Sequence, residues 1–424
     1  MATSGLHTAP AWARTTDWQE RAAIAERSVL ERHLVRSFFL PFTATGMTVW
    51  PYCWRDRFTV KWNFWWQAHL IGCMTDAMDR AETAHNQRVL KRLARTHYRV
   101  NGRRWRHNKY YDDLAWAAVA VQRAERRGYL TGYEKVLRDV RRRFEDAYNP
   151  KYAIPWCTDK DYWNTPTNGA AAIFLARCGD KKAVQLAERI CDWMYKNLQV
   201  KDGPNAGLYA DGIRLVEGCK KREDAIYTYC QGVAMGAELE LALRSEEGQQ
   251  EEHLRRVCEI VEACERTLLS SEGILLAGGS GDGGLFKGIL MRYMADVARR
   301  MPGIETDPGK PLWDGRLHAV QESAARMVMQ NAQSLWKTAA WLPEGVLFSA
   351  KWDKPARLPL HVSKTSNDDN KSTKVGVEVD ISAVAERDMS TQLSGWMTVE
   401  SAARLVRMDC SFGLSLIHIS EPTR

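Results

Sequence analysis

The chain has 424 residues, of which 45% are hydrophobic and 17 are tryptophan, so it is long enough to bury a large core. Its formal charge of +8, from 60 basic and 52 acidic residues, is moderate for this length. No stretch approaches the roughly 20 apolar residues of a membrane span, and the first thirty residues lack the apolar core of a signal peptide. We therefore expect a globular protein without a membrane span, located in the cytoplasm.

Helical periodicity dominates the chain, and strand-like alternation is scarce. The pattern predicts twelve helices, near residues 15–36, 65–81, 84–100, 112–127, 131–147, 168–179, 182–199, 224–245, 249–269, 284–301, 314–336 and 390–408. Twelve helices in sequential pairs, without a composition shift that separates two cores, predict an all-α fold: an (α/α)6 toroid formed by one domain over residues 1–413.

The last eleven residues, LSLIHISEPTR (414–424), share no periodicity with what precedes them. They resemble the translation of a sequencing adapter, so we expect this segment to be a non-native tail. His418 accordingly carries no functional weight.

The stretch KWNFWWQAH (61–69) begins the second predicted helix with aromatic and amide side chains. Sugars present apolar C–H faces to aromatic rings and hydroxyl groups to amides and acids. Trp65 and Trp66 are therefore candidate substrate-binding residues, although tryptophans in such positions are also ordinary core residues.

Between Arg88 and Lys109 the chain carries nine Lys or Arg residues and no acid. A nucleic-acid-binding surface is one interpretation. A solvated outer helix is the preferred one, because no nucleic-acid-binding motif accompanies the run.

The stretch KYYDDLAW places Asp112 and Asp113 side by side, after Tyr111, at the start of an apolar helix. One interpretation is helix capping, since Asp is favoured in the first turn and is stabilised there by the helix dipole. The other is a glycosidase pair, whose carboxyl groups lie ~5 Å apart in retaining enzymes and ~6.5–9.5 Å apart in inverting ones. Adjacent residues reach the shorter separation more easily, because their Cα atoms are only ~3.8 Å apart.

Three further stretches carry polar and aromatic side chains close to predicted helix starts: DYWNTPTNG (161–169), GLYADGI (207–213) and YTYCQG (227–232). Each alone is more typical of a core aromatic or a helix cap. Their recurrence on several hairpins favours substrate binding, with the candidates Tyr111, Trp163, Asn168, Asp211, Tyr229 and Gln231.

The glycine-rich stretch LAGGSGDGGLFKG (276–288) contains a formal GxGxxG, but no strand precedes it and no βαβ unit surrounds it. Its glycines more plausibly let the backbone approach a ligand, with Asp282 or Lys287 at the edge of the site. HExxH, GxSxG and DDxxD motifs are absent, which removes support for zinc proteases, α/β-hydrolases and prenyl-diphosphate enzymes.

Five motifs together resemble glycoside hydrolase family 76, the endo-α-1,6-mannanase family. In chain order they are WNFWWQAHL, KYYDDLAWAAVAVQRA, YTYCQGVAMGAELEL, GGLFKGILMRYM and MSTQLSGWMTVESAARL, and the similarity extends from about Thr15 to Met408. The resemblance implies an (α/α)6 barrel and retaining hydrolysis of α-1,6-mannosidic bonds without a metal or cofactor. It also implies that Asp112 is the nucleophile and Asp113 the general acid/base.

Two functions from different classes follow. The first is a retaining hydrolase of α-1,6-mannan or mannose-containing oligosaccharides, which becomes a transglycosylase if water is excluded from the glycosyl-enzyme. The second is a non-catalytic helical toroid that binds glycan or nucleic acid. The adjacent aspartates favour the first, because binding alone does not require them, and we expect no nucleic-acid partner.

Overall fold

A computed structural model gives the fold of most of the chain. It describes residues 15–36, 41–52, 62–102, 105, 107–245, 247–276, 278–302, 311–359, 371–374, 377–380 and 384–412. The predicted tail, 414–424, lies outside these residues. Within them, no helix combines the length and the hydropathy needed to cross a membrane.

Twelve α-helices lie in the described residues, and each corresponds to one predicted helix, with bounds that differ by no more than four residues. They are α1 (Trp18–His33), α2 (Phe64–Arg80), α3 (Ala84–Val100), α4 (Tyr111–Arg126), α5 (Glu134–Ala147), α6 (Thr165–Cys178), α7 (Lys181–Asn197), α8 (Thr228–Ala242), α9 (Glu247–Leu268), α10 (Phe286–Arg300), α11 (Pro311–Thr338) and α12 (Met389–Phe412).

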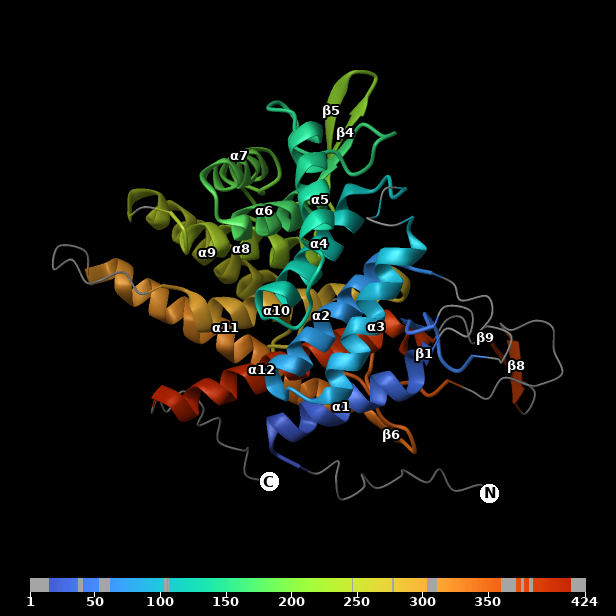
Figure 1. Ribbon diagram of the computed structural model, residues 1–424. Coiled ribbons are helices and arrows are strands. Elements are labelled where there is room, and N and C mark those ends of the chain that lie inside the picture. Colours follow the sequence, from blue (N-terminus) through green and yellow to red (C-terminus); the bar gives the residue numbers. More distant parts are fainter. Residues whose placement is uncertain are drawn as a thin grey trace.

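The even-numbered helices form the inner wall of a closed ring. From α2 to α12, each packs against the next even-numbered helix, and α12 packs against α2. The odd-numbered helices lie outside this wall, for example α7 against α6 and α9 against α8 (Figure 1). The arrangement confirms the predicted (α/α)6 toroid.

Burial differs between the two layers, as their sequences require. Every residue of the inner helix α8 is buried except Tyr229, because α8 has neighbours on all sides. The outer helix α5 buries only Val136, Val140 and Phe144, which recur every four residues on one face. Inner helices also approach closely: a Cβ on Gly288 of α10 would lie 2.6 Å from the Cα of Ser394 in α12.

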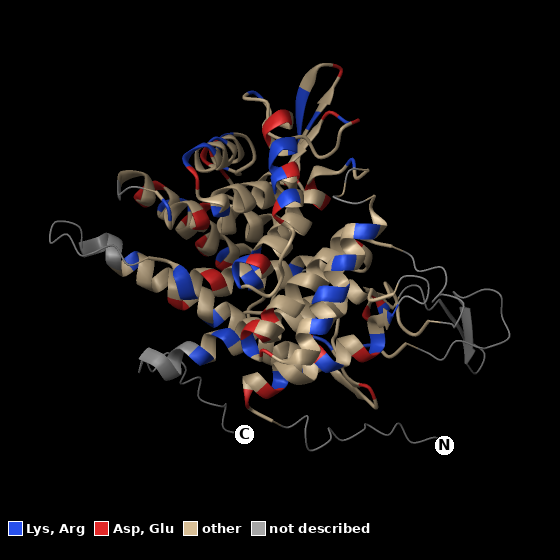
Figure 2. Cartoon of the chain, viewed as in Figure 1, with Lys and Arg blue, Asp and Glu red and all other residues tan. Residues whose placement is uncertain are grey.

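The basic run falls partly on α3, an outer helix. Figure 2 shows Lys and Arg repeated along it. Arg88, Lys91 and Arg95 are exposed, whereas Leu90 and Leu93 are buried. This amphipathic pattern is that of a solvated outer helix.

Short strands occupy the long loops and were not predicted, because segments of three to five residues carry too little alternation to be recognised. All pairings are antiparallel. The strands are β1 (Leu34–Arg36), β2 (Ala44–Gly46), β3 (Tyr162–Asn164), β4 (Gly212–Val216), β5 (Cys219–Glu223), β6 (Ala340–Leu342), β7 (Gly345–Leu347), β8 (Lys371–Lys374) and β9 (Val377–Asp380). The β4–β5 hairpin stands out from the body of the ring (Figure 1).

Four inner helices hold a neighbouring loop with a buried amide side chain. In each, the fourth helical residue is Asn or Gln, and its amide accepts from the N–H and donates to the C=O of one loop residue. We call these contacts loop clamps; they join Gln67 to Gly46, Asn168 to Ile154, Gln231 to Tyr209 and Gln392 to Phe348. The loops at this end of the ring are therefore fixed through their main chain.

A layer of ion pairs crosses the inner wall on the C-terminal side of the clamps. Asp76 of α2 lies 2.8 Å from Arg123 of α4 and 2.7 Å from Arg292 of α10. Further pairs connect α6 to α8 and α10 to α12; they are Arg177–Glu240 and Arg404–Asp296. Together with Arg300–Glu240, which joins α10 to α8, these pairs link all six inner helices.

Candidate active site

Asp112 and Asp113 occupy the second and third positions of α4, at the N-terminal end of the inner wall. The N-cap position itself is Tyr110, which makes no side-chain cap bond. The Asp113 N–H donates to Oδ1 of Asp112 at 2.8 Å. Because the helix dipole favours negative charge here, the first turn suits both the capping and the glycosidase interpretations.

Hydrogen bonds distinguish the two carboxylates. The indole N–H of Trp156 donates to Oδ2 of Asp112 at 2.9 Å, and Nδ2 of Asn108 donates to Oδ2 of Asp113 at 3.0 Å. Asp112 thus accepts from a backbone and an indole N–H, both of which favour its ionised form. Among the described residues, neither carboxylate forms a salt bridge.

The pKa values of the two carboxyl groups separate accordingly. Burial, followed by the charge of Asp282, raises the pKa of Asp112 to about 6. The hydrogen bonds that Asp112 accepts act in the opposite direction and lower its pKa. Burial, followed by the charge of Asp112, raises the pKa of Asp113 well above its usual range. Near neutral pH the pair therefore holds one proton preferentially on Asp113, the division of roles that an acid and a nucleophile require.

The loop before α6 positions Trp156 over the start of α4. The Tyr111 N–H donates to the Trp156 carbonyl at 2.8 Å, and the Trp156 N–H donates to the Tyr162 carbonyl at 2.7 Å. Sequence reasoning missed Trp156 and Asn108, because both lie in loops whose path the sequence does not reveal. The nearest available signal was the high aromatic content of the stretch 148–163.

Aromatic rings from four inner helices line the same end of the ring. Tyr229 of α8 stacks on Phe286 of α10, with centroids 3.9 Å apart and planes 3° from parallel. The ring centroid of Trp65 in α2 lies 6.4 Å from that of Tyr229, and the ring centroid of Trp116 in α4 lies 6.5 Å from it. All four helices contribute residues from their N-terminal halves, so these rings form an apolar wall suited to the C–H face of a sugar.

A third carboxylate joins this end of the site. Asp282 lies in the 3₁₀ turn η3 (Gly281–Leu285), just before α10. Its Oδ1 accepts from the indole N–H groups of Trp65 and Trp66, at 2.9 and 2.8 Å. The predicted candidates Trp65 and Trp66 thus lie at the site with Asp282, which sequence analysis placed at its edge.

Asp211 also belongs to this region. It precedes β4, and its Oδ2 accepts a short hydrogen bond from the Tyr162 hydroxyl, while its Oδ1 lies 3.7 Å from the Cys230 thiol. The charges of Asp211 and Asp112 both add to the effect of burial in raising the pKa of Tyr229. Tyr229 thus lies near both Asp211 and Asp112, and a role of Asp211 and Tyr229 in substrate binding stays a prediction.

The side chains of five other candidates contact groups of the protein itself. The Asn168 and Gln231 amides are fully buried and engaged in loop clamps. Lys287 is buried and donates to the Ala350 carbonyl at 2.8 Å. The remaining two aromatic candidates pack on their neighbours.

These two are Tyr111 and Trp163. The Tyr111 ring lies near Phe144 of α5, with centroids 6.4 Å apart. Trp163 is buried and stacks on Tyr152 at 4.4 Å. Both rings thus have packing partners within the protein, and their contact with a substrate stays a prediction.

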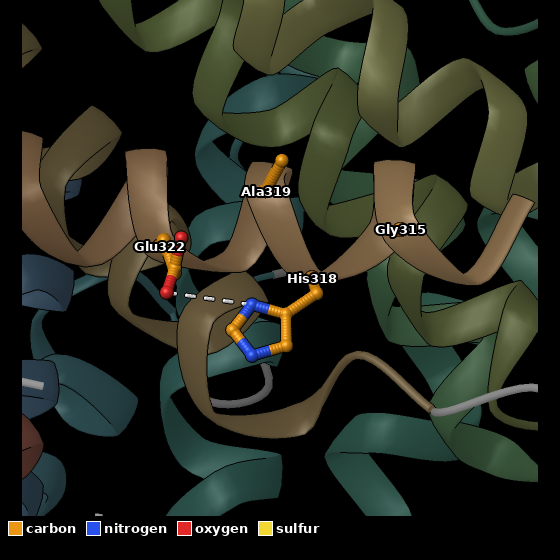
Figure 3. Close-up of a pocket in the computed structure, with 4 residues that line it drawn as sticks. All are labelled: Gly315, His318, Ala319 and Glu322. Carbon is orange, nitrogen blue, oxygen red and sulfur yellow. Dashed lines mark ion pairs between the residues drawn. The ribbon is translucent and has the colours of Figure 1, made fainter. Parts of the chain in front are cut away.

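Two hollows lie away from the carboxylates. One, of about 320 Å³, follows α11 at the exposed residues His318 and Glu322, whose Nδ1 and Oε1 atoms are 3.5 Å apart (Figure 3). The other, of about 30 Å³, is lined by residues of the inner wall that include His69, Arg123 and Arg292. In the described part of the chain, no group of three or more His, Cys, Asp or Glu residues is arranged to hold a metal ion.

Comparisons with known proteins agree with this geometry. The family model described as glycosyl hydrolase family 76 matches residues 20–359. The α-1,6-mannanase GH76A from Salegentibacter sp. HEL1_6 superposes with a TM-score of 0.71 at 24% identity, over 91% of this chain and 99% of that one. A second structure of that enzyme is an inactive variant, with two consecutive aspartates replaced by asparagine and α-1,6-mannotriose bound.

Two further structures share the fold. The family 76 mannosidase Bt3792 from Bacteroides thetaiotaomicron has a TM-score of 0.64 at 15% identity, over 92% of this chain and 99% of that one. Dfg5 from Chaetomium thermophilum, solved with glucosamine, has a TM-score of 0.66 at 13% identity, over 94% and 93%. No functionally curated protein matches the chain. Since the family model covers most of the sequence, the chain belongs to glycosyl hydrolase family 76.

Proposed function

We propose that the protein is a retaining glycoside hydrolase that cleaves α-1,6-linked mannan or related mannosides through a covalent glycosyl-enzyme. The observation that carries this proposal is the adjacent pair Asp112 and Asp113, placed beside an aromatic wall at the N-terminal end of the ring. The separated pKa values give the two carboxyl groups different protonation at the same pH.

In the first step, the Asp112 carboxylate attacks C1 of the mannosyl unit while Asp113 donates its proton to the departing O6 of the next sugar. The C1–O6 bond breaks and a β-linked glycosyl ester with Asp112 forms. In the second step, Asp113 takes a proton from water, which attacks C1 from the opposite side. The ester bond breaks, Asp112 is regenerated and the product keeps the α configuration.

The hydrogen bonds of the site fit this division. Trp156 and the Asp113 N–H hold the Asp112 carboxylate in one orientation, as a nucleophile requires. The Salegentibacter enzyme supports a catalytic role of the pair, because an inactive variant of it carries two consecutive aspartate-to-asparagine replacements and binds α-1,6-mannotriose. When an acceptor sugar replaces water in the second step, the same chemistry produces transglycosylation.

The test compares variants of the two aspartates on α-1,6-mannan and on an aryl α-mannoside with a good leaving group. Asp112→Asn should lose turnover of both substrates, because no glycosyl-enzyme can form. Asp113→Asn should lose turnover of mannan but show a burst of aryl alcohol, since the activated leaving group needs no proton and the ester then accumulates. The burst is measured by rapid-mixing absorbance.

Azide identifies the nucleophile independently. With Asp113→Ala, azide should restore turnover and give the α-mannosyl azide, because it attacks the glycosyl-enzyme without a general base. A β-mannosyl azide from this variant would mean that the two roles are exchanged. Full mannan hydrolysis by both asparagine variants would reduce the pair to a helix cap and overturn its catalytic role. A wild-type protein that hydrolyses neither substrate would favour the non-catalytic binding protein.

A further inference from the structure

Asp282 is held in an unusual way for an exposed carboxylate. Both indole N–H groups, from Trp65 and Trp66, donate to the same oxygen, Oδ1. Among the described residues, no hydrogen bond is made to Oδ2. The exposed side chain thus has one oxygen fixed by two indoles and one without a hydrogen-bond donor among the described residues.

The turn that carries Asp282 is itself fixed by the start of α12. The Gly281 N–H donates to Oδ2 of Asp388 at 2.6 Å, and the Ser390 hydroxyl donates to the Gly281 carbonyl at 2.6 Å. Gly284 packs so closely on Ser390 that a Cβ there would overlap its hydroxyl. Glycines in this stretch thus serve close packing, which brings the carboxylate to a defined position rather than leaving it on a free loop.

Asp282 also faces the catalytic pair. Its negative charge acts on both Asp112 and Asp113, and both partner indoles belong to α2, which packs against α4. The other groups that act on the pair are the donors Asn108 and Trp156. Asp282 therefore lies close enough for its charge to act on both carboxyl groups, and it contacts Trp65 of the aromatic wall.

We propose that Asp282 is a substrate-positioning residue whose Oδ2 accepts hydrogen bonds from hydroxyl groups of the sugar that lies between α4 and the aromatic wall. A sugar hydroxyl is the donor that a free carboxylate oxygen at this place can recruit. Hydrogen bonds to a charged acceptor are stronger than neutral ones, and the two indoles remove the freedom that would weaken them. The inference rests on the proposed function and names a further contact for its substrate.

The substitution Asp282→Asn tests this contact with little change of shape. The two indoles need an oxygen at the inner position, so the asparagine must turn its NH2 group outward. The position that accepts a hydrogen bond would then offer a donor instead. We expect binding of a mannoside to weaken about tenfold to one hundredfold, the range for a lost hydrogen bond to a charged group.

Binding is measured by calorimetry with α-1,6-mannotriose, in a parent protein that carries Asp112→Asn and Asp113→Asn and so cannot turn over the ligand. The matched control is Asp161→Asn, an exposed aspartate of the loop before β3. This control should bind within about twofold of the parent, since its exposed side chain makes no hydrogen bond or ion pair among the described residues. Monodeoxy mannosides locate the hydroxyl: the deoxy compound that lacks it should lose affinity for the parent but not for the Asp282→Asn variant.

A second readout separates substrate positioning from a structural role. In the otherwise wild-type enzyme, Asp282→Asn removes a negative charge that faces Asp112 and Asp113, so both pKa values should fall. Both limbs of the bell-shaped pH profile of kcat/KM should then shift to lower pH. A loss of packing would not cause this shift.

The outcomes distinguish the two proposals. Equal mannotriose affinity with and without Asp282→Asn, in a parent that binds, would overturn the role of Asp282 and leave the proposed function intact. A parent that binds no mannotriose would overturn both, because the substrate itself would be wrong. Weaker binding together with the acid shift of the profile would support both.

Discussion

At the scale of single residues, the site depends on how two neighbouring carboxyl groups share one proton. Burial raises both pKa values, but Asp112 has two donors that favour its charge and Asp113 has one. The structure thus creates a difference between chemically identical side chains through the indole of Trp156. Together with the Asp113 N–H, a loop residue outside the aspartate motif thus favours the charged form of Asp112.

The pH dependence of activity should follow from this order. Asp112 must be ionised to attack, so kcat/KM should fall as the pH decreases through about 6, the pKa of Asp112. Asp113 must be protonated, so activity should also fall at a higher pH, set by its raised pKa. Initial rates on an oligomannoside between pH 4 and 9 would measure both limbs. A profile flat down to pH 4.5 would contradict the raised pKa of Asp112.

At the residue level, the sequence pointed to the motif that carries the proposed chemistry, whereas polarity alone did not distinguish ligands from structural amides. The adjacent aspartates were recognisable because their repulsion needs an explanation. Asn168 and Gln231 looked like sugar ligands, yet their amides bond the main chain of loops. Sequence position cannot distinguish these roles, since both place an amide at the start of an inner helix.

At the scale of elements, the helices were predictable and the loops were not. The outer helices have one apolar face and the inner ones are apolar nearly all round, so both patterns are visible in the sequence. The sheet β3–β4–β5 joins two loops far apart in the chain through the register Trp163↔Ile213. Such pairings depend on the closure of the ring, which no local pattern encodes.

The loop clamps should matter for stability rather than for binding. Gln231→Leu would leave the N–H and C=O of Tyr209 and the carbonyl of Tyr227 without their amide partner. Since buried polar groups without partners each cost about 1–3 kcal/mol, we expect a loss of roughly 2–4 kcal/mol in the free energy of unfolding. Urea denaturation would measure it.

The control for this variant is Gln249→Leu, on the exposed surface of α9, which should change stability by less than about 0.5 kcal/mol. Below the unfolding transition, KM of the Gln231→Leu variant should stay near the wild-type value. A large rise of KM without loss of stability would restore Gln231 as a substrate ligand.

At the scale of the whole molecule, the ring is closed by buried charge as well as by apolar packing. Asp76 lies between Arg123 and Arg292 and so connects α2, α4 and α10. The sequence shows these residues only as isolated charges in apolar helices, and their pairing appears only when the ring is closed. Breaking one such pair leaves an uncompensated buried charge, which is costly.

Asp76→Asn should therefore destabilise the protein by about 3–5 kcal/mol at pH 7. The two arginines lower the pKa of Asp76, so its contribution is present at neutral pH and is lost as the pH falls through that lowered value. The difference in unfolding free energy between wild type and variant should shrink under strong acid. Asp202→Asn, on an exposed loop, is the control and should leave the melting temperature unchanged.

The loop clamps also bear on how this ring can diversify. Each clamp forms hydrogen bonds only with the main-chain N–H and C=O groups of a loop residue and does not involve the side chain of that residue. Mutations can therefore replace the residues that face the sugar without loosening the loop that presents them. A scaffold of this kind keeps its shape while its glycan preference drifts, which provides a physical route by which sequences only 13–24% identical retain one architecture.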